Sequence, residues 1–311
     1  MENIAIFDIG SARTKALFLI NENGNVIQYN EKLDSFISSK VNSNNILDES
    51  YLIEEFIPQL TLLKDKAIDK GCSKLLLIGT HIFRTISNSA AVNSLIDEKL
   101  GKLNSIPGWV EGALFYKSQF GKFPDHKICV LDIGGGSVQI SFGIKEDLVY
   151  SIPTGTFSLE KQFQENKDRA NENELFKMSE FISTEIANTS KRDADVIVMG
   201  SNCMRDFIES CRSHIGDTSD VETFYSLNLL RDIYSLLKCR PYETVKDFYP
   251  QNSMFMYGAD KALLNVILIA EFLRIDKIHP TNDSVSSALA TILSKSSEEL
   301  SNFSISITNL K

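Results

Sequence analysis

The sequence predicts an α/β protein made of two similar domains. Two stretches, Ile4–Ile20 and Cys129–Gly143, share one pattern: an apolar run, Asp-Ile-Gly, small polar residues and a second apolar run. Their aspartates, Asp8 and Asp132, lie 124 positions apart (132 minus 8), and a repeated unit of this kind indicates an internal duplication. The length of 311 residues is ordinary for two domains.

Composition and charge narrow the class of protein. Hydrophobic residues make up 43% of the chain and charged residues 23%, which is typical of folded domains and not of disordered or fibrous chains. The net charge is −9 and the isoelectric point about 5.1, so nucleic acid and anionic membranes would be repelled. We expect neither as a partner, and a polyanionic substrate would need a local basic site or a metal ion.

Targeting signals and metal motifs are not apparent in the sequence. No stretch of eighteen apolar residues occurs, and the first apolar run is interrupted by Asp8 and Arg13. The five cysteines are odd in number and widely spaced, without a C-x-x-C pair. Disulfides and a zinc site are therefore not expected, and we predict a cytoplasmic protein.

The glycine-rich turn after Asp132 is the strongest local signal. Gly134, Gly135 and Gly136 stand in a row before Ser137, and this run costs backbone entropy unless the absence of Cβ atoms serves a purpose. Backbone N–H groups can then approach a phosphate closely. A plain hairpin with a glycine bulge is the alternative, but the second copy, with Gly10 and Ser11, favours a phosphate chain between two halves.

The first half reads as alternating strands and helices. After the strand pair Ile4–Ile20 comes a turn at Asn21–Gly24, then a third strand over Val26–Lys32 and a loop over Ser38–Asn45. Asp48 is a predicted N-cap for a helix reaching about Asp69. The apolar residues of this helix recur at three- and four-residue spacing and are predicted to be core: Leu52, Phe56, Leu60, Leu63 and Ala67.

Two charged residues of the first half are candidates for a site. Arg84 follows a short buried strand, Lys74–Gly79, and ligands of open α/β sheets gather at such strand ends. Its planar guanidinium suits phosphate, although an ordinary surface arginine is the alternative. Asn88 lies one helical turn further on. Glu111 falls in the first turn of a helix that starts at Gly108, where the helix macrodipole favours a carboxylate.

The second half is predicted to continue the pattern. Strands are expected at Val196–Met199 and Ile275–Ile278, and the remaining expected elements are helices and connections. These are a charged loop or helix start at Gln164–Glu174, an amphipathic helix at Leu175–Thr189, core helices at Leu227–Lys238 and Met256–Phe272 with Asp260 as a possible cap, a last helix at Asn282–Leu293, and a polar tail at Ser294–Asn309.

Taken in order, five motifs resemble the exopolyphosphatase / guanosine pentaphosphate phosphohydrolase family of the actin-like ATPase superfamily. They are DIGSART (Asp8–Thr14), GTHIFR (Gly79–Arg84) with Asn88, PGWVEGA (Pro107–Ala113), DIGGGSVQ (Asp132–Gln139) and SIPTGTFSLEKQF (Ser151–Phe163). The resemblance reaches about residue 206 and fits a two-domain form of the family, without the extra C-terminal domains of its longer members. It implies two ribonuclease-H-like domains, residues 1–118 and 119–311, with the active site in the cleft between them and a last helix that can pack back on the first domain.

The resemblance also implies an activity and a role for each motif residue. The activity is removal of a terminal phosphate from inorganic polyphosphate or guanosine pentaphosphate with Mg²⁺ or Mn²⁺, and a homodimer is one possible assembly. Glu111 would activate the attacking water, with Gln139 helping to orient it. The other implied roles are metal binding (Asp8 and Asp132) and phosphate binding (Gly10, Ser11, Arg84, Asn88, Gly134, Gly135, Gly136 and Ser137).

The chain departs from the family pattern in three places and leaves other functions open. Gln139 stands where the family has Glu, Ala12 where it has Asn, and Asn202-Cys203 where it has Gly-Thr. Apyrase-type nucleoside tri- and diphosphate hydrolases also carry Gln at the position of Gln139, so that activity is an alternative. An actin-like kinase would need a base pocket and a second substrate, and a non-catalytic sensor would bind polyphosphate without turnover.

Overall fold

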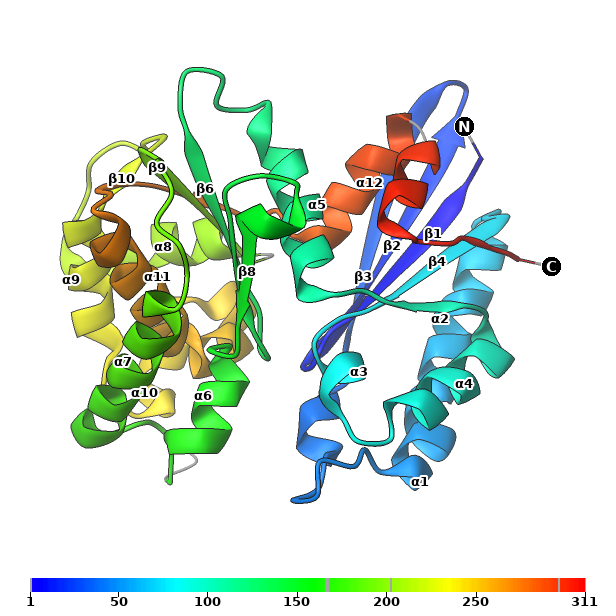
Figure 1. Ribbon diagram of the computed structural model, residues 1–311, viewed down its shortest axis with the longest axis horizontal. Coiled ribbons are helices and arrows are strands. Elements are labelled where there is room, and N and C mark those ends of the chain that lie inside the picture. Colours follow the sequence, from blue (N-terminus) through cyan, green and yellow to red (C-terminus); the bar gives the residue numbers. More distant parts are fainter. Residues whose placement is uncertain (1, 166–167, 202, 296, 311) are drawn as a thin grey trace. The chain divides into compact units, whose positions relative to one another are not determined.

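The structure is a computed structural model, and it describes residues 2–165, 168–201, 203–295 and 297–310 (Figure 1). The chain divides into two compact units. The first unit is Met1–Leu114 together with Val285–Lys311, and the second unit is Phe115–Ser284. The sequence places the corresponding division at residues 118 and 119, so the two positions differ by four residues.

The first unit is built on a sheet with the strand order β12-β4-β1-β2-β3, to which β5 adds by pairing with β4. β1 and β2, and β2 and β3, are antiparallel, whereas β4 runs parallel to both β1 and β5. The bounds are β1 (Ile4–Ile9), β2 (Arg13–Glu22), β3 (Asn25–Asp34), β4 (Lys74–Gly79), β5 (Leu103–Ser105) and β12 (Thr308–Asn309).

The helix predicted after Asp48 forms in the first unit. The Asp48 side chain accepts hydrogen bonds from the N–H groups of Ser50 and Tyr51, which confirms the predicted N-cap. Pro58 has no N–H for the preceding turn, and a π-helical turn, Leu52–Phe56, lies directly before it. All five predicted core residues of this segment are buried. The helices are α1 (Glu49–Tyr51), α2 (Ile57–Asp69), α3 (Ile82–Thr85), α4 (Ser89–Leu100) and α12 (Val285–Lys295).

The second unit repeats the strand arrangement of the first. Its sheet has the order β10-β11-β9-β6-β7-β8. In both sheets the first three strands along the chain are antiparallel neighbours, and the first strand continues into parallel partners. This shared order confirms the duplication that the two Asp-Ile-Gly motifs predict. The strands are β6 (Ile128–Ile133), β7 (Val138–Ser141), β8 (Val149–Ile152), β9 (Val196–Gly200), β10 (Tyr225–Ser226) and β11 (Lys277–Thr281).

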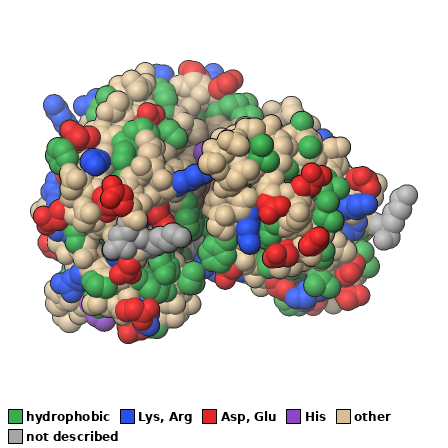
Figure 2. Space-filling view, turned by 90° about the horizontal axis from the view of Figure 1, so that it is seen from below, with side chains coloured by type: hydrophobic (Ala, Val, Ile, Leu, Met, Phe, Trp, Pro, Cys, Tyr) green, Lys and Arg blue, Asp and Glu red, His purple; other side chains and the backbone are tan. Residues whose placement is uncertain are grey.

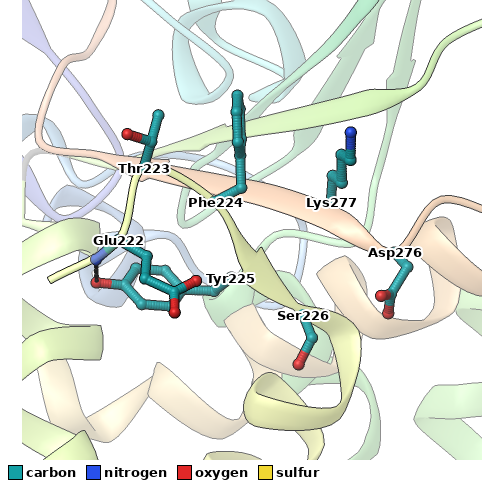
Figure 3. Close-up of a pocket in the computed structure, with 7 residues that line it drawn as sticks. All are labelled: Glu222, Thr223, Phe224, Tyr225, Ser226, Asp276 and Lys277. Carbon is teal, nitrogen blue, oxygen red and sulfur yellow. Dashed lines mark hydrogen bonds between the residues drawn. The ribbon is translucent and has the colours of Figure 1, made fainter. Parts of the chain in front are cut away.

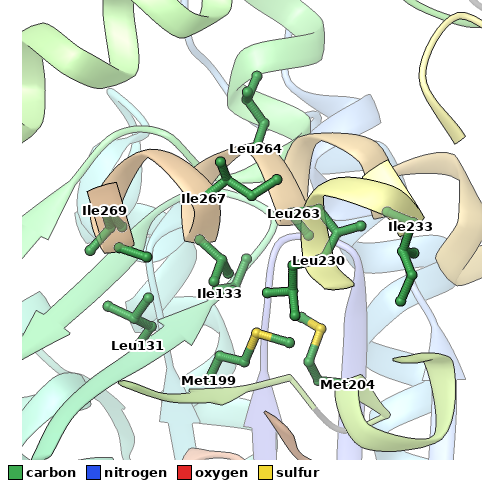
Figure 4. Packing of buried hydrophobic residues seen from close by; sticks show 14 of the residues in the cluster. Leu131, Ile133, Met199, Met204, Leu230, Ile233, Leu263, Leu264, Ile267 and Ile269 are labelled. Atoms are coloured by element: carbon green, nitrogen blue, oxygen red, sulfur yellow. The ribbon is translucent and has the colours of Figure 1, made fainter. Parts of the chain in front are cut away.

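The core of the second unit lies between its sheet and its helices. Leu131 and Ile133 of β6 belong to one buried cluster with Leu230 of α9 and Leu263 of α11, and Figure 4 shows Leu131 below Ile269 of α11. The helices are α6 (Thr156–Phe163), α7 (Glu172–Ala187), α8 (Met204–Arg212), α9 (Leu227–Leu237), α10 (Tyr242–Val245) and α11 (Ala259–Leu273), and α5 (Gly108–Phe120) contains the division between the units. This packing leaves the strand ends of the sheet to the connecting loops.

Several sequence expectations are wrong or incomplete. The predicted polar tail contains a 3₁₀ helix, Ser297–Phe303, and β12, which pairs with β4, because Leu300 and Ile305 supply buried apolar anchors. Asp260 does not cap α11 but is buried in an ion pair with Arg169.

α7 begins three residues earlier than expected, because Asn171 and Glu174 form a capping box. Within the expected charged loop, residues 166 and 167 lie outside the described part of the chain.

Two surface properties follow from the structure. On the face seen in Figure 2, acidic and basic side chains are interspersed. Among the described helices, no single one is long and apolar enough to cross a membrane. One bent pair, Pro250–Tyr257 with Ala259–Leu273 at 69°, has the necessary length and composition.

Candidate active site

Each unit has an Asp-Ile-Gly turn at the end of its first strand, and the two turns have the same geometry. We call Gly10–Arg13 the first glycine turn and Gly134–Ser137 the second. In the first, the Gly10 N–H donates to the Arg13 carbonyl at 2.9 Å, and in the second the Gly134 N–H donates to the Ser137 carbonyl at 3.0 Å. A Cβ on either glycine would lie 3.1 Å from that carbonyl oxygen, so the close approach favours glycine.

The carbonyl groups of the first glycine turn point toward a neighbouring loop. The Ser11 carbonyl accepts a hydrogen bond from the Ser38 N–H at 2.9 Å, and the Ala12 carbonyl accepts one from the Phe36 N–H at 2.8 Å. Ala12 therefore contributes through its backbone, which any residue supplies. Its replacement of the family's asparagine leaves this backbone arrangement in place.

The second glycine turn is held in the same way by the start of α6. The Gly135 carbonyl accepts hydrogen bonds from the Phe157 and Ser158 N–H groups at 2.8 and 3.1 Å, and the Gly136 carbonyl accepts one from the Ser158 hydroxyl at 2.7 Å. The fit is tight at Gly155, where a Cβ would lie 2.4 Å from the Gly136 carbonyl carbon. No side chain larger than hydrogen fits there without movement.

The inner N–H groups of both turns are available to a ligand. Within the described part of the chain, the N–H groups of Ser11, Ala12, Gly135 and Gly136 have no protein acceptor. Because the carbonyl groups of the same residues are bonded elsewhere, each turn presents donors without competing acceptors. Such concave arrays of amides bind anions, above all phosphate.

Arg84 and Glu111, two candidates that are 27 positions apart in sequence, meet in the first unit. Arg84 belongs to α3, after β4, and Glu111 to the first turn of α5, after β5. Both terminal nitrogens of Arg84 donate to Oε2 of Glu111 at 3.2 Å, and Nη1 also donates to the Ile106 carbonyl. The side chains are 20% and 11% exposed. This charge-assisted pair fixes the carboxylate while leaving it within reach of solvent.

The side chain of Asn88 is hydrogen-bonded to the backbone of Leu47. Its Oδ1 accepts from the Leu47 N–H at 3.0 Å, and its Nδ2 donates to the Leu47 carbonyl at 3.0 Å. One of its two amide hydrogens is therefore engaged by the backbone of another loop. The expected contact with phosphate stays a prediction, for which one amide hydrogen remains.

Gln139 is bound to two serines next to the second glycine turn. It is 1% exposed, and its Nε2 donates to Oγ of Ser137 at 2.8 Å and to Oγ of Ser151 at 3.1 Å. Because the Ser137 oxygen accepts from Gln139, the hydroxyl hydrogen of Ser137 stays available to donate to another acceptor. The sequence did not single out Ser151, which joins the site only through pairing of β7 with β8.

Lys15 was also missed by the sequence analysis. It faces Asp8 across β1 and β2, in the position that Gln139 takes opposite Asp132 across β6 and β7. Its Nζ lies 3.6 Å from Oδ2 of Asp8. A lysine in an otherwise apolar strand was the available signal, because such a charge seldom lies on a buried face without a partner.

His81 precedes α3 and lies beside Arg84. Burial and the positive charge of Arg84 lower the pKa of His81 to about 4. At neutral pH its imidazole is therefore uncharged and adds no positive charge to the site.

The carboxylates of Asp8 and of Asp132 are each a donor type that suits Mg²⁺ better than a structural metal. In the described residues, no group of three or more His, Cys, Asp or Glu side chains is arranged to hold a metal. Structural zinc sites use four protein ligands, whereas Mg²⁺ keeps several waters and binds through one or two carboxylates plus substrate phosphates. Each aspartate offers such an oxygen donor beside a glycine turn.

Two other features of the second unit lie outside the predicted site residues. Asn202 lies outside the described residues, and Cys203 is buried at the start of α8, 3.4 Å from Nδ2 of Asn252. An open pocket of about 520 Å³ lies beside β10 and β11, and Figure 3 shows the residues that line it. Its lining residues are Glu222, Thr223, Phe224, Tyr225, Ser226, Asp276 and Lys277, and the sequence motifs include none of them.

The sequence of this chain matches a known family model over more than half of its length. The model describes the Ppx/GppA phosphatase family and matches residues 27–207. The chain belongs to the Ppx/GppA phosphatase family. The matched range includes Arg84, Glu111 and the second glycine turn, and it begins after the first glycine turn.

Relatives of this Ppx/GppA chain include proteins named exopolyphosphatase. Exopolyphosphatase 1 of Mycobacterium tuberculosis (strain ATCC 25618 / H37Rv) is 30% identical over 102 residues, and so is the protein of the same name from Mycobacterium bovis. These matches cover 31% of this chain and 30% of each relative. The matched segment thus spans under a third of the curated relatives.

Solved structures show the fold over nearly the whole chain. The Ppx/GppA family member of Aquifex aeolicus has a TM-score of 0.73 at 18% identity, covering 97% of this chain and 98% of that one. An exopolyphosphatase from Cytophaga hutchinsonii has a TM-score of 0.78 at 17% identity, covering 94% and 98%. The fold is therefore the two-domain actin-like ATPase fold that the sequence predicts.

Proposed function

We propose that this protein hydrolyses the terminal phosphoanhydride bond of inorganic polyphosphate or guanosine pentaphosphate, by attack of a water molecule that Glu111 activates. The observation that carries the proposal is the Arg84–Glu111 pair, whose Nη–Oε2 distances are 3.2 Å. A terminal phosphate drawn to Arg84 arrives beside a carboxylate. Membership of the Ppx/GppA family and the exopolyphosphatase names of relatives support the same reaction class.

Glu111 activates the attacking water, and Arg84 offsets negative charge on the phosphate. Hydrolysis of a phosphoanhydride has a good leaving group, so a positioned carboxylate and charge neutralisation suffice without a covalent intermediate. Glu111 orients the water and takes its proton as the oxygen attacks phosphorus. Arg84 holds the carboxylate through Oε2 and offsets negative charge on the phosphate, and Asn88 adds a contact through its remaining amide hydrogen.

The two glycine turns bind the phosphate chain. The N–H groups of Ser11 and Ala12 in one turn, and of Gly135 and Gly136 in the other, donate to phosphate oxygens. The Ser137 hydroxyl donates as well, because Gln139 already donates to its oxygen at 2.8 Å. In this proposal Gln139 acts through Ser137 and also keeps the water ordered.

Asp8 and Asp132 would each hold Mg²⁺ or Mn²⁺ through a carboxylate oxygen, and the ion would supply charge neutralisation at the phosphates and the leaving group. Lys15, whose Nζ lies 3.6 Å from Oδ2 of Asp8, would keep that carboxylate in place.

Apyrase-like hydrolysis of nucleoside tri- and diphosphates is the second candidate. Gln139 favours it, because the apyrase motif has glutamine at this position and here the amide holds Ser137 next to the second glycine turn. The same water attack by Glu111 would serve both reactions. The two candidates differ only in the group that follows the phosphates.

The setting of the reaction is proposed from composition. A net charge of −9 disfavours nucleic acid and anionic membranes as partners, so we propose a small or linear polyanion as substrate. The cysteine pattern, without a C-x-x-C pair, favours a reducing compartment, and we propose a cytoplasmic enzyme. A homodimer is part of the proposal, and size-exclusion chromatography with light scattering measures it directly.

Phosphate release from three substrates tests the proposal. Long-chain polyphosphate, guanosine pentaphosphate and ATP are each incubated with the purified protein and Mg²⁺, with and without a chelator. We expect release from polyphosphate or guanosine pentaphosphate that stops with the chelator. Release from ATP alone would favour the apyrase-like candidate, transfer to a second substrate would indicate a kinase, and binding without release would contradict hydrolysis.

A further inference from the structure

Helix α11 has a polar patch that the proposed reaction does not use. Asp260, Lys261 and Asn265 are 0%, 1% and 0% exposed, on a helix whose other buried residues are apolar. Lys261 and Asn265 are four positions apart and so share one face of the helix. Both side chains contact segments next to α6.

The contacts of this patch hold α6 on both sides. Nδ2 of Asn265 donates to the carbonyl of Thr154 at 2.9 Å, two residues before α6 begins. Nζ of Lys261 donates to Oε1 of Gln164, the C-cap residue of α6, at 3.1 Å. The eight-residue helix is therefore anchored at its entry and at its exit by one face of α11.

The start of α6 in turn holds the second glycine turn. The N–H groups of Thr156 and Phe157 donate to the carbonyls of Gly134 and Gly135 at 3.1 and 2.8 Å. Thr156 also lies against α11, since a Cβ on Gly258 would be 2.9 Å from the Cβ of Thr156. A shift of α6 must therefore move the carbonyls of the turn and, with them, its inner N–H groups.

Stability alone does not explain why this patch is polar. Arg169 and Asp260 form a buried ion pair at 2.8 Å, with side chains 4% and 0% exposed, and such pairs are often no more stable than apolar replacements. In the described residues, four buried polar atoms of this region have no partner: Nη2 of Arg169, Oδ2 of Asp260, Oδ1 of Asn265 and Oγ1 of Thr154. Unsatisfied groups of this kind call for another reason to keep them.

We propose that Asn265 and Lys261 are positioning residues that keep the second glycine turn in its anion-binding form by fixing α6. Neither residue touches the substrate. The proposal deepens the proposed function and rests on it in one respect, namely that this turn binds phosphate. The mechanical part of the proposal is the structural link from α11 through α6 to the second glycine turn, and it can be tested without any substrate.

Hydrogen exchange measured by mass spectrometry tests the mechanical part. Asn265→Leu removes the donor to Thr154 while keeping a similar volume. We expect the amides of Thr156–Ser158, which donate to the turn, to exchange about fivefold faster, the effect of one lost hydrogen bond. The control is Ile269→Val, a core change on the same helix (Figure 4), which should leave these amides unchanged. Equal exchange in Asn265→Leu and wild type would overturn the proposal.

A second variant keeps the test valid if Asn265→Leu fails to fold. Gln164→Leu removes the acceptor of Lys261 from a partly buried position without altering α11. We expect about twofold faster exchange of the same amides, because α6 keeps its entry contact. If Gln164→Leu folds and leaves this exchange unchanged, the positioning role of Lys261 is wrong.

Binding of tripolyphosphate separates this inference from the proposed function. We expect its dissociation constant to rise about fivefold in Asn265→Leu and not in Ile269→Val. An unchanged dissociation constant in Asn265→Leu, with wild type binding well, would overturn the positioning role and leave hydrolysis standing. Faster exchange with no binding by wild type would support the mechanical link and instead refute the phosphate role of the turn.

Discussion

At the level of single residues, the direction of one hydrogen bond distinguishes this site from the family pattern. Nε2 of Gln139 donates to Oγ of Ser137 at 2.8 Å. A glutamate at the same position would accept the hydroxyl hydrogen of Ser137 instead. The glutamine therefore leaves the Ser137 hydrogen available to another acceptor.

We predict that Gln139→Glu weakens substrate binding. The reversed hydrogen bond and the added negative charge should raise KM for polyphosphate about fivefold or more, with a smaller change in kcat. Steady-state kinetics measures both constants. Gln28→Glu, an exposed position on β3, is the matched control. An unchanged KM with tighter magnesium binding would mean that position 139 serves the metal instead.

His81 gives the stability of the first unit a pH dependence. Its pKa is about 4 in the folded chain because of burial and Arg84, against 6.5 in the unfolded chain. Between these values the unfolded chain binds a proton that the folded chain does not. The free energy of unfolding should therefore fall on acidification from pH 6.5 to 4, by up to about 3 kcal/mol.

Urea unfolding of His81→Gln between pH 7 and 4 checks this dependence. The variant should lose less stability on acidification than wild type. Some dependence will remain, because burial also lowers the pKa of His279. His214→Gln, at an exposed position, controls for the loss of a histidine. Parallel stability curves for His81→Gln and wild type would contradict the assignment.

At the level of elements, the contact of α6 with the second glycine turn fixes the conformation of that turn. Gly155 has an ordinary backbone conformation, with φ −59°, so glycine is needed for space and not for φ. A Cβ there would meet the backbone of the turn at 2.4–2.5 Å.

Gly155→Ala should therefore push α6 away from the turn. We expect a loss of about 1–3 kcal/mol in the free energy of unfolding, together with weaker binding of tripolyphosphate. Gly121→Ala is the control, because a Cβ there meets nothing within 4 Å. Chemical denaturation and a binding titration measure the two effects, and wild-type behaviour of Gly155→Ala would show that the contact is not essential.

Elements with a clear spacing of apolar residues were predictable from the sequence, whereas elements that form only by pairing with distant segments were not. The helix after Asp48 follows from its apolar spacing. The helix α8 has the same signal in Met204, Phe207, Ile208 and Cys211, all buried, and was overlooked. The strands β5 and β12 are too short to show a period, and they form only because β4 offers edges to pair with.

The candidate site was predictable to a similar degree. Both glycine turns and the residues Arg84 and Glu111 follow from motifs, and the structure brings the last two together. The bonding of the turn carbonyls could not be predicted, since it comes from Phe36, Ser38 and the start of α6. Nor could the engagement of Asn88 with Leu47, because that contact joins loops 41 positions apart.

At the level of the whole molecule, two units with one strand order carry different residues opposite their aspartates. Lys15 faces Asp8 in the first unit, and Gln139 faces Asp132 in the second. The duplicated frame thus supplies two similar glycine turns with different charges beside them. In the part of the chain that the structure describes, neither unit offers a three-ligand metal cluster.

We therefore predict that magnesium binding depends on phosphate. Calorimetry should show weak binding of Mg²⁺ to the protein alone, and binding tightened at least about tenfold by a methylene-bridged diphosphate, which supplies the missing oxygen ligands. Asp132→Asn should lose this enhancement. Tight binding of Mg²⁺ without phosphate would contradict a site completed by the substrate.

The most direct test of the central claim is the rate of phosphate release from polyphosphate by Glu111→Gln. This change keeps the volume of the side chain and removes its ability to take a proton. We predict a fall in kcat of about 10²–10⁴-fold with KM little changed, while Glu98→Gln, an exposed change on α4, retains full activity. A Glu111→Gln protein that releases phosphate at the wild-type rate would contradict the account.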